Sequence, residues 1–113
     1  MSNYTNFIIS ITATPMDAIP TLEEAKILLF EQIPELIELS LLWEYPRMWY
    51  GEMKSLDVDK LIETLKKLNW PQPNWVVVMW NNDADFASTW HTQRLGEAVE
   101  LISGDGFRSI EGA

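Results

Sequence analysis

The chain contains no cysteine. This absence excludes disulfide bonds, thiolate zinc sites and cysteine nucleophiles, and it fits a reducing compartment. Long apolar runs are also missing, since no stretch approaches the ~18 uninterrupted apolar residues that a membrane-spanning helix needs. The first residues lack the basic segment and the cleavage site of a secretory signal. We therefore expect a cytoplasmic protein that has no membrane partner.

Positive charge is scarce. Eight lysines and arginines stand against 17 aspartates and glutamates, which gives a formal net charge of −9. Proteins that bind nucleic acid carry basic patches, so we expect no nucleic-acid partner. A negative field attracts a basic protein instead, and that attraction weakens as the salt concentration rises. The simpler alternative is that the surplus of acids only maintains solubility.

Signatures of catalysis and of metal binding are scarce as well. His91 is the only histidine and lies close to Thr89 and Thr92, but a lone histidine on an outer strand is more often a packing or surface residue. Segment 81–85 offers oxygen ligands, yet it lacks the spacing, the central glycine and the distal glutamate of a calcium loop. Glycine-rich phosphate loops are absent. The sequence therefore predicts no cofactor, no metal site and no catalytic residue, and it favours a protein that is not an enzyme.

Length and hydrophobicity predict a single domain with a substantial core, because the chain has 113 residues of which 47% are hydrophobic. Three segments alternate apolar and polar residues with a period of two, which predicts strands at 6–13, 38–45 and 85–92. Segment 48–54 resumes after a short break at Pro46 and Arg47, which predicts a strand that pairs with 38–45 in an antiparallel hairpin. The apolar run within 74–80 does not alternate and predicts a strand covered on both faces. Helical spacing of apolar residues predicts helices at 21–33 and 55–68, the first beginning with a capping box of Thr21 and Glu24.

Two local details follow from the strand pattern. Leu39, Leu41, Trp43 and Tyr45 alternate in segment 38–45 and are expected to share one face, opposite Ser40 and Glu44. Gly51 interrupts the next strand and predicts either a bulge or the close approach of a neighbouring group.

The predicted element order is β-α-β-β-α-β followed by a fifth strand, which predicts an α+β fold. This order is that of a ferredoxin-like sandwich, with both helices on one face of a mainly antiparallel sheet. Right-handed crossovers place the first strand between the third and the fourth, and the fifth strand protects the edge of the fourth. The predicted strand order is therefore 2-3-1-4-5.

The C-terminal residues allow two structures. Segment 95–102 fits a short helix that ends at Gly104 and is followed by a brief strand at 107–110. The alternative is a hairpin of 99–103 and 107–111 that turns at Gly104. The helix is favoured.

Aromatic residues gather in segments 43–50 and 70–90. They are too numerous in the first segment to be all core, and tryptophan and tyrosine are enriched at the centres of protein interfaces. In the second segment only the rim is expected to be available for contact. The predicted partner-binding residues are Trp43, Glu44, Tyr45, Trp49, Tyr50, Trp80, Asp83, Asp85, Trp90 and His91. The alternative is that these aromatics pack beneath the helices.

The leading hypothesis is a non-enzymatic acidic protein that binds a basic protein partner. Small inhibitors such as toxin-neutralising immunity proteins and phage-borne inhibitors share this combination of a compact α+β fold, strong acidity and no catalytic signature. A second hypothesis is a small-ligand-binding domain or enzyme with a pocket on the open sheet face near His91. A third is a homodimer formed through the sheet face or through an unprotected strand.

Overall fold

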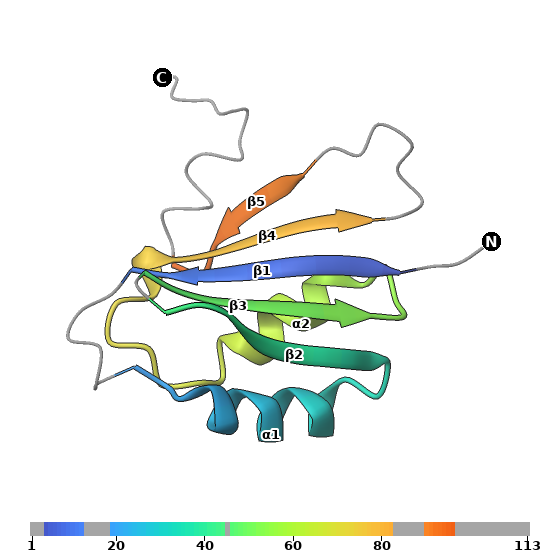
Figure 1. Cartoon of the computed structure of the whole chain (residues 1–113), viewed down its shortest axis with the longest axis horizontal. Helices are drawn as coiled ribbons and strands as arrows, with labels where there is room; N and C mark the ends of the chain where they lie inside the picture. Colours follow the sequence, from blue (N-terminus) through green and yellow to red (C-terminus); the bar gives the residue numbers. More distant parts are fainter. Residues whose placement is uncertain (1–3, 13–18, 45, 83–89, 97–113) are drawn as a thin grey trace.

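The computed structural model describes residues 4–12, 19–44, 46–82 and 90–96. Along the chain the elements are β1 (Thr5–Ile11), α1 (Leu22–Gln32), β2 (Leu36–Trp43), β3 (Arg47–Met53), α2 (Val58–Leu65), the 3-10 turn η2 (Pro73–Trp75), β4 (Val76–Asn82) and β5 (His91–Arg94) (Figure 1). This is the predicted order of strands and helices, with shifted ends. Two predictions lie wholly or partly outside the described residues: the start of the fifth strand predicted at 85–92, and the C-terminal helix or hairpin from residue 97 onward.

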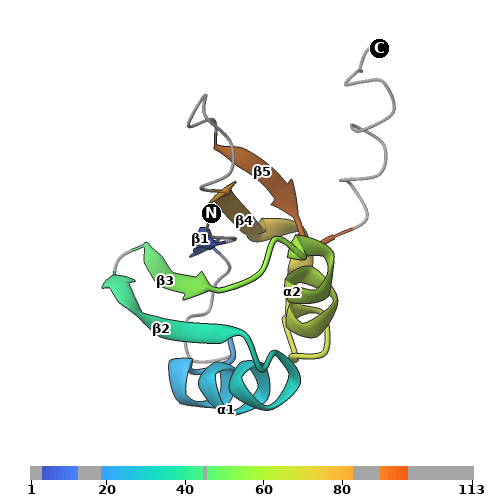
Figure 2. The same ribbon diagram turned by 90° about the vertical axis from the view of Figure 1, so that its right-hand side faces the viewer.

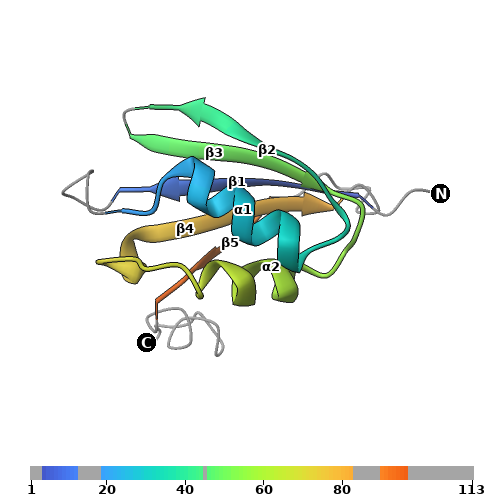
Figure 3. The same cartoon turned by 90° about the horizontal axis from the view of Figure 1, so that it is seen from below.

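The strands form one five-stranded sheet in the order β2-β3-β1-β4-β5, and every neighbouring pair is antiparallel. This is the strand order that the sequence predicted. The arrangement is α+β and is compatible with a ferredoxin-like fold. Both helices lie on the same side of the sheet (Figures 2 and 3). No helix in the described segments is long and apolar enough to cross a membrane.

The core lies between the helices and the sheet face that they cover. Odd-numbered residues of β1 point into it, and the even-numbered residues point to the other face, which we call the open face. The side chains that fill the core are fully or almost fully buried; they include Phe7, Ile9, Ile11, Ala25, Leu29, Trp49, Met53, Leu61, Leu65, Val76 and Val78. One contiguous cluster therefore joins both helices to the three central strands.

Strand β4 corrects one prediction. Val76 and Val78 are buried, whereas Val77 and Met79 are only partly buried, so the strand is not covered on both faces. It is interior because β1 and β5 pair with its two edges, and its apolar character on the outer face belongs to the open face. Trp75, which was predicted within this strand, lies in η2 and is exposed.

Two predicted local features are confirmed. The Thr21 hydroxyl accepts a hydrogen bond from the Glu24 amide at 3.1 Å, and the Glu24 carboxylate accepts one from the Thr21 amide at 2.9 Å, which completes the capping box. Gly51 allows a close approach, because a Cβ at this position would lie only 2.1 Å from the Phe7 ring. Phe7 lies opposite Gly51 across the pairing of β1 with β3.

Strand β2 departs from simple alternation. Its register against β3 shifts between Leu36 and Glu38 and again between Leu41 and Trp43. Leu41 pairs with Trp49 of the core, but after the second shift Trp43 pairs with Met48 on the open face. The prediction that Leu41 and Trp43 share a face is therefore wrong, because a bulge inserts one extra residue and reverses the alternation after it.

Candidate functional site

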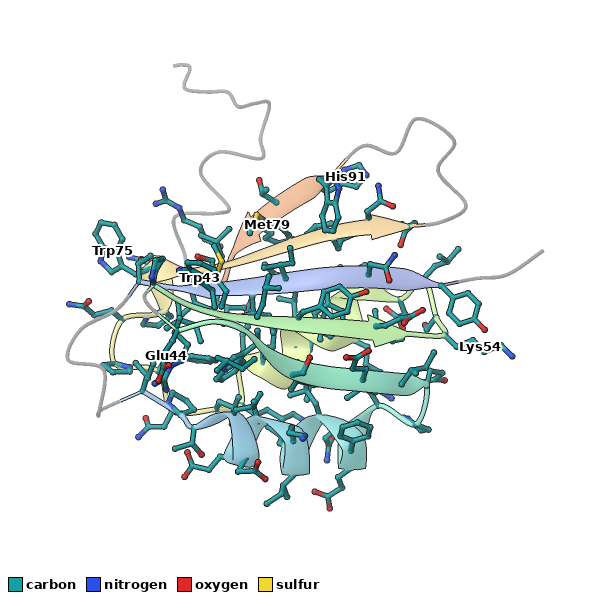
Figure 4. All side chains as sticks on the ribbon, viewed as in Figure 1. Trp43, Glu44, Lys54, Trp75, Met79 and His91 are labelled. Atoms are coloured by element: carbon teal, nitrogen blue, oxygen red, sulfur yellow. The ribbon has the colours of Figure 1, made fainter. Side chains whose placement is uncertain are left out.

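Six residues of the predicted site fall into two groups at opposite edges of the sheet. The group at one edge belongs to the β2–β3 hairpin: Trp43, Glu44 and Tyr50. The group at the other edge consists of Trp80 on β4, His91 at the start of β5, and Trp90 directly before β5. Strand β1 lies between the two hairpins, so the structure does not combine these residues into a single site (Figure 4).

The remaining predicted residues do not contribute to either surface. Tyr45, Asp83 and Asp85 lie outside the described residues. Trp49 is completely buried and packs against Trp70, with ring centroids 6.0 Å apart. Because its side chain has no exposed surface, Trp49 belongs to the core and is left out of any contact surface.

At the β4–β5 edge Trp80 and His91 pack on each other, whereas Trp90 is exposed. The rings of Trp80 and His91 stack with centroids 5.5 Å apart and an interplanar angle of 30°. Trp80 packs against the hydrophobic core on the helix-covered side of the sheet. Among the described residues there is no group of acidic or histidine side chains that could hold a metal ion. A hollow of about 830 Å³ lies between the α2–β4 connection and the end of β5, and His91 is not among its lining residues.

Strand β2 carries an unusual number of exposed apolar side chains. Nine large apolar side chains are exposed in the described segments, and four of them belong to this strand. They are Ile37 at 49%, Leu41 at 49%, Leu42 at 47% and Trp43 at 60%. Sequence reasoning identified only Trp43. Ile37 and Leu42 lie at the two register shifts, which depend on the pairing with β3, whereas Leu41 is exposed although it lies in the regular ladder opposite Trp49.

The open face continues this apolar surface across the sheet. Tyr50 of β3 lies opposite Ile8 of β1, and Ile8 lies opposite Met79 of β4. The Tyr50 hydroxyl donates a hydrogen bond to Asn6 Oδ1 at 3.1 Å, which fixes the phenol ring on this face. Figure 4 views the protein from the open face, with Trp43 and Met79 labelled.

Acidic side chains lie beside these apolar residues. Glu38 of β2 is directly opposite Glu52 of β3, an arrangement in which like charges repel. Burial raises the pKa of Tyr50, and the charges of Glu52 and Glu38 raise it further. The two carboxylates thus add negative charge beside the phenol on the open face.

Basic residues are absent from the neighbouring stretch of chain. Segment 27–46 contains no lysine, arginine or histidine. The bases nearest to β2 along the hairpin are Arg47, the first residue of β3, and Lys54, directly after its last residue. We call the apolar and acidic residues of this edge the β2 surface: Ile37, Glu38, Leu41, Leu42, Trp43, Glu44, Tyr50 and Glu52.

Comparison with known proteins assigns no relatives. No family model, curated protein or solved structure matches the chain. The function is therefore inferred from the chemistry of the β2 surface alone.

Proposed function

We propose that this protein is a non-enzymatic acidic binding protein that docks a basic protein partner through the β2 surface. The observation that carries the proposal is the position of the half-exposed apolar side chains of β2 beside the opposed carboxylates of Glu38 and Glu52. A cation placed over these carboxylates relieves their repulsion, and apolar groups of the partner cover the leucines and Trp43.

The two components of the surface have different roles. Full burial of a large apolar side chain contributes ~1.5–3 kcal/mol, so covering a half-exposed one contributes roughly 1 kcal/mol. Exposed ion pairs contribute ~0–1 kcal/mol each, and they are screened by salt. We therefore assign most of the affinity to the apolar residues, and the association rate and the choice of partner to the acids.

The proposal includes an inhibitory role. An acidic surface with an apolar centre fits a basic active site or a nucleic-acid-binding groove, which is the kind of target that immunity proteins and phage-borne inhibitors cover. A ferredoxin-like sandwich supplies the rigid sheet on which such a surface is displayed, and the cysteine-free composition suits action in the cytoplasm.

The test is affinity capture from an extract of the native host with matched baits. Leu42→Ser removes apolar contact on the β2 surface, whereas Leu56→Ser removes a similarly exposed leucine (42%) from the segment that precedes α2. We expect a basic protein that is retained by the wild type and by Leu56→Ser and is lost with Leu42→Ser.

Electrostatic steering is tested on the same captured protein. Its association rate is expected to fall with rising salt, and to fall again when Glu38→Gln and Glu52→Gln are combined. A partner that is retained equally by all baits, or whose association rate ignores ionic strength, contradicts the proposed function.

A further inference from the structure

We propose that β2 binds its partner by strand addition, with an extended basic segment of the partner pairing along the outer edge of β2 as a sixth strand. This mode rests on the proposed function and specifies how the β2 surface is used. Strand addition obtains affinity from main-chain hydrogen bonds and selectivity from alternate side chains.

The edge of β2 is open to such pairing. Strand β2 is the last strand in the sheet order, so in the described part of the sheet only β3 pairs with it (Figure 1). Natural edge strands are commonly protected by lysine, by proline or by very short length. Strand β2 has eight residues, LIELSLLW, without lysine or proline. Its two bulges leave a regular ladder at residues 38–41, and this segment is the expected centre of the pairing.

The register defines what the added strand must present on each face. Glu38 and Ser40 lie on the open face of β2, opposite Glu52 and Tyr50, whereas Leu39 and Leu41 lie on the helix-covered face. An added strand pairs more stably when its basic side chains lie on the open face beside the glutamates and its apolar side chains lie on the helix-covered face beside the leucines. The matching segment therefore alternates basic and apolar residues.

The charge of β2 favours pairing with a different, basic protein over pairing with a second copy of this chain. A second copy would bring Glu35, Glu38 and Glu44 to the same edge, and its segment 27–46 contains no basic residue to neutralise them. Like charges that meet across an antiparallel pair are destabilising, and opposite charges are stabilising. Pairing of β2 with a second copy of this chain is therefore disfavoured, whereas pairing with a basic segment of another protein is favoured.

The experiment uses a peptide of alternating lysine and valine that has the length of β2, 8 residues. Binding is followed by amide chemical-shift changes in the full-length isotope-labelled protein. Two matched peptides carry N-methyl groups, one on every lysine amide and the other on every valine amide, so each loses the hydrogen-bond donors of one edge. A strand pairs through one edge, so we expect one methylated peptide to lose about tenfold or more in affinity and the other to bind like the parent.

A protein variant tests the location. Leu41→Lys adds a charge to the regular part of β2, and Leu56→Lys adds the same charge at a control position outside the sheet. We expect the parent peptide to bind about tenfold more weakly to Leu41→Lys and unchanged to Leu56→Lys. Glu38→Lys, at an exposed position, provides the same comparison if Leu41→Lys does not fold.

The outcomes separate the two proposals. If both methylated peptides bind β2 as well as the parent peptide does, strand addition is wrong while docking of a basic partner on the β2 surface stands. If the parent peptide shifts no amide of β2, strand addition is overturned as well. The proposed function is judged independently by the capture experiment.

Discussion

Replacing Gly51 by alanine tests the packing of the sheet against its core. An alanine Cβ at this position would lie 2.1 Å from Cζ, 2.4 Å from Cε1 and 2.8 Å from Cε2 of the Phe7 ring. Phe7 is completely buried, so its ring cannot rotate into solvent to make room. The ring and the strand must therefore separate, or the ring must leave its preferred rotamer.

The expected magnitude follows from two opposing effects. Overpacking a core by a methyl group costs ~1–3 kcal/mol, and the severity of this overlap places the cost at the upper end. Replacing glycine by alanine in a strand recovers roughly 0.5–1 kcal/mol of backbone entropy. We expect Gly51→Ala to lower the free energy of unfolding by about 2 kcal/mol, which corresponds to roughly 8 °C in Tm for a domain of this size.

Urea unfolding followed by tryptophan fluorescence measures this change, and a double-mutant cycle isolates its cause. Phe7→Leu alone removes volume and destabilises the protein, but it leaves space above residue 51. Gly51→Ala should cost at least ~1 kcal/mol less in the Phe7→Leu background than in the wild type. Additive costs, or an alanine variant as stable as the wild type, would refute the close approach of the ring to the strand.

Three further predictions concern the open face, the core tryptophans and a helix terminus. The pKa of Tyr50 is raised above its ordinary value of 10.0, so the free energy of unfolding should fall as pH rises from 10 through the raised pKa. Glu52→Gln should lower this pKa. The pKa is measured from the tyrosinate absorbance, with Tyr50→Phe as the reference. Trp70→Phe should lower the free energy of unfolding, measured in urea, by ~1 kcal/mol more than Trp49→Phe does. The reason is that the Trp70 indole donates a 2.7 Å hydrogen bond to an α2 carbonyl, whereas the buried Trp49 indole has no hydrogen-bond partner in the described structure. Equal losses for the two variants would contradict this reasoning. Thr21→Ala should lower the free energy of unfolding by about 1 kcal/mol through loss of the α1 cap, and an unchanged urea midpoint would show that the cap contributes nothing.

The site was harder to predict than the fold because exposure depends on what covers each face. The unbroken apolar run of β4 predicted cover on both faces, yet Val77 and Met79 lie on the open face. The predicted strand order already placed the two aromatic hairpins at opposite edges of the sheet. It did not show that Leu42 lies in a bulge and that Trp43 turns to the open face, because a bulge exists only relative to the partner strand.

By itself, the sequence determined the elements and their order. The period of two in β1, the capping box at Thr21 and the apolar stripe of α2 are local, because each depends on residues within a few positions of one another. Chain order and right-handed crossovers then sufficed for the arrangement of the strands. Only the tertiary structure decided which aromatic residues are core and which are surface. Trp49 and Tyr50 are adjacent in sequence, yet one is sealed under the helices and the other lies on the open face beside Glu52, because successive residues of a strand point to opposite faces and only one face is covered by helices.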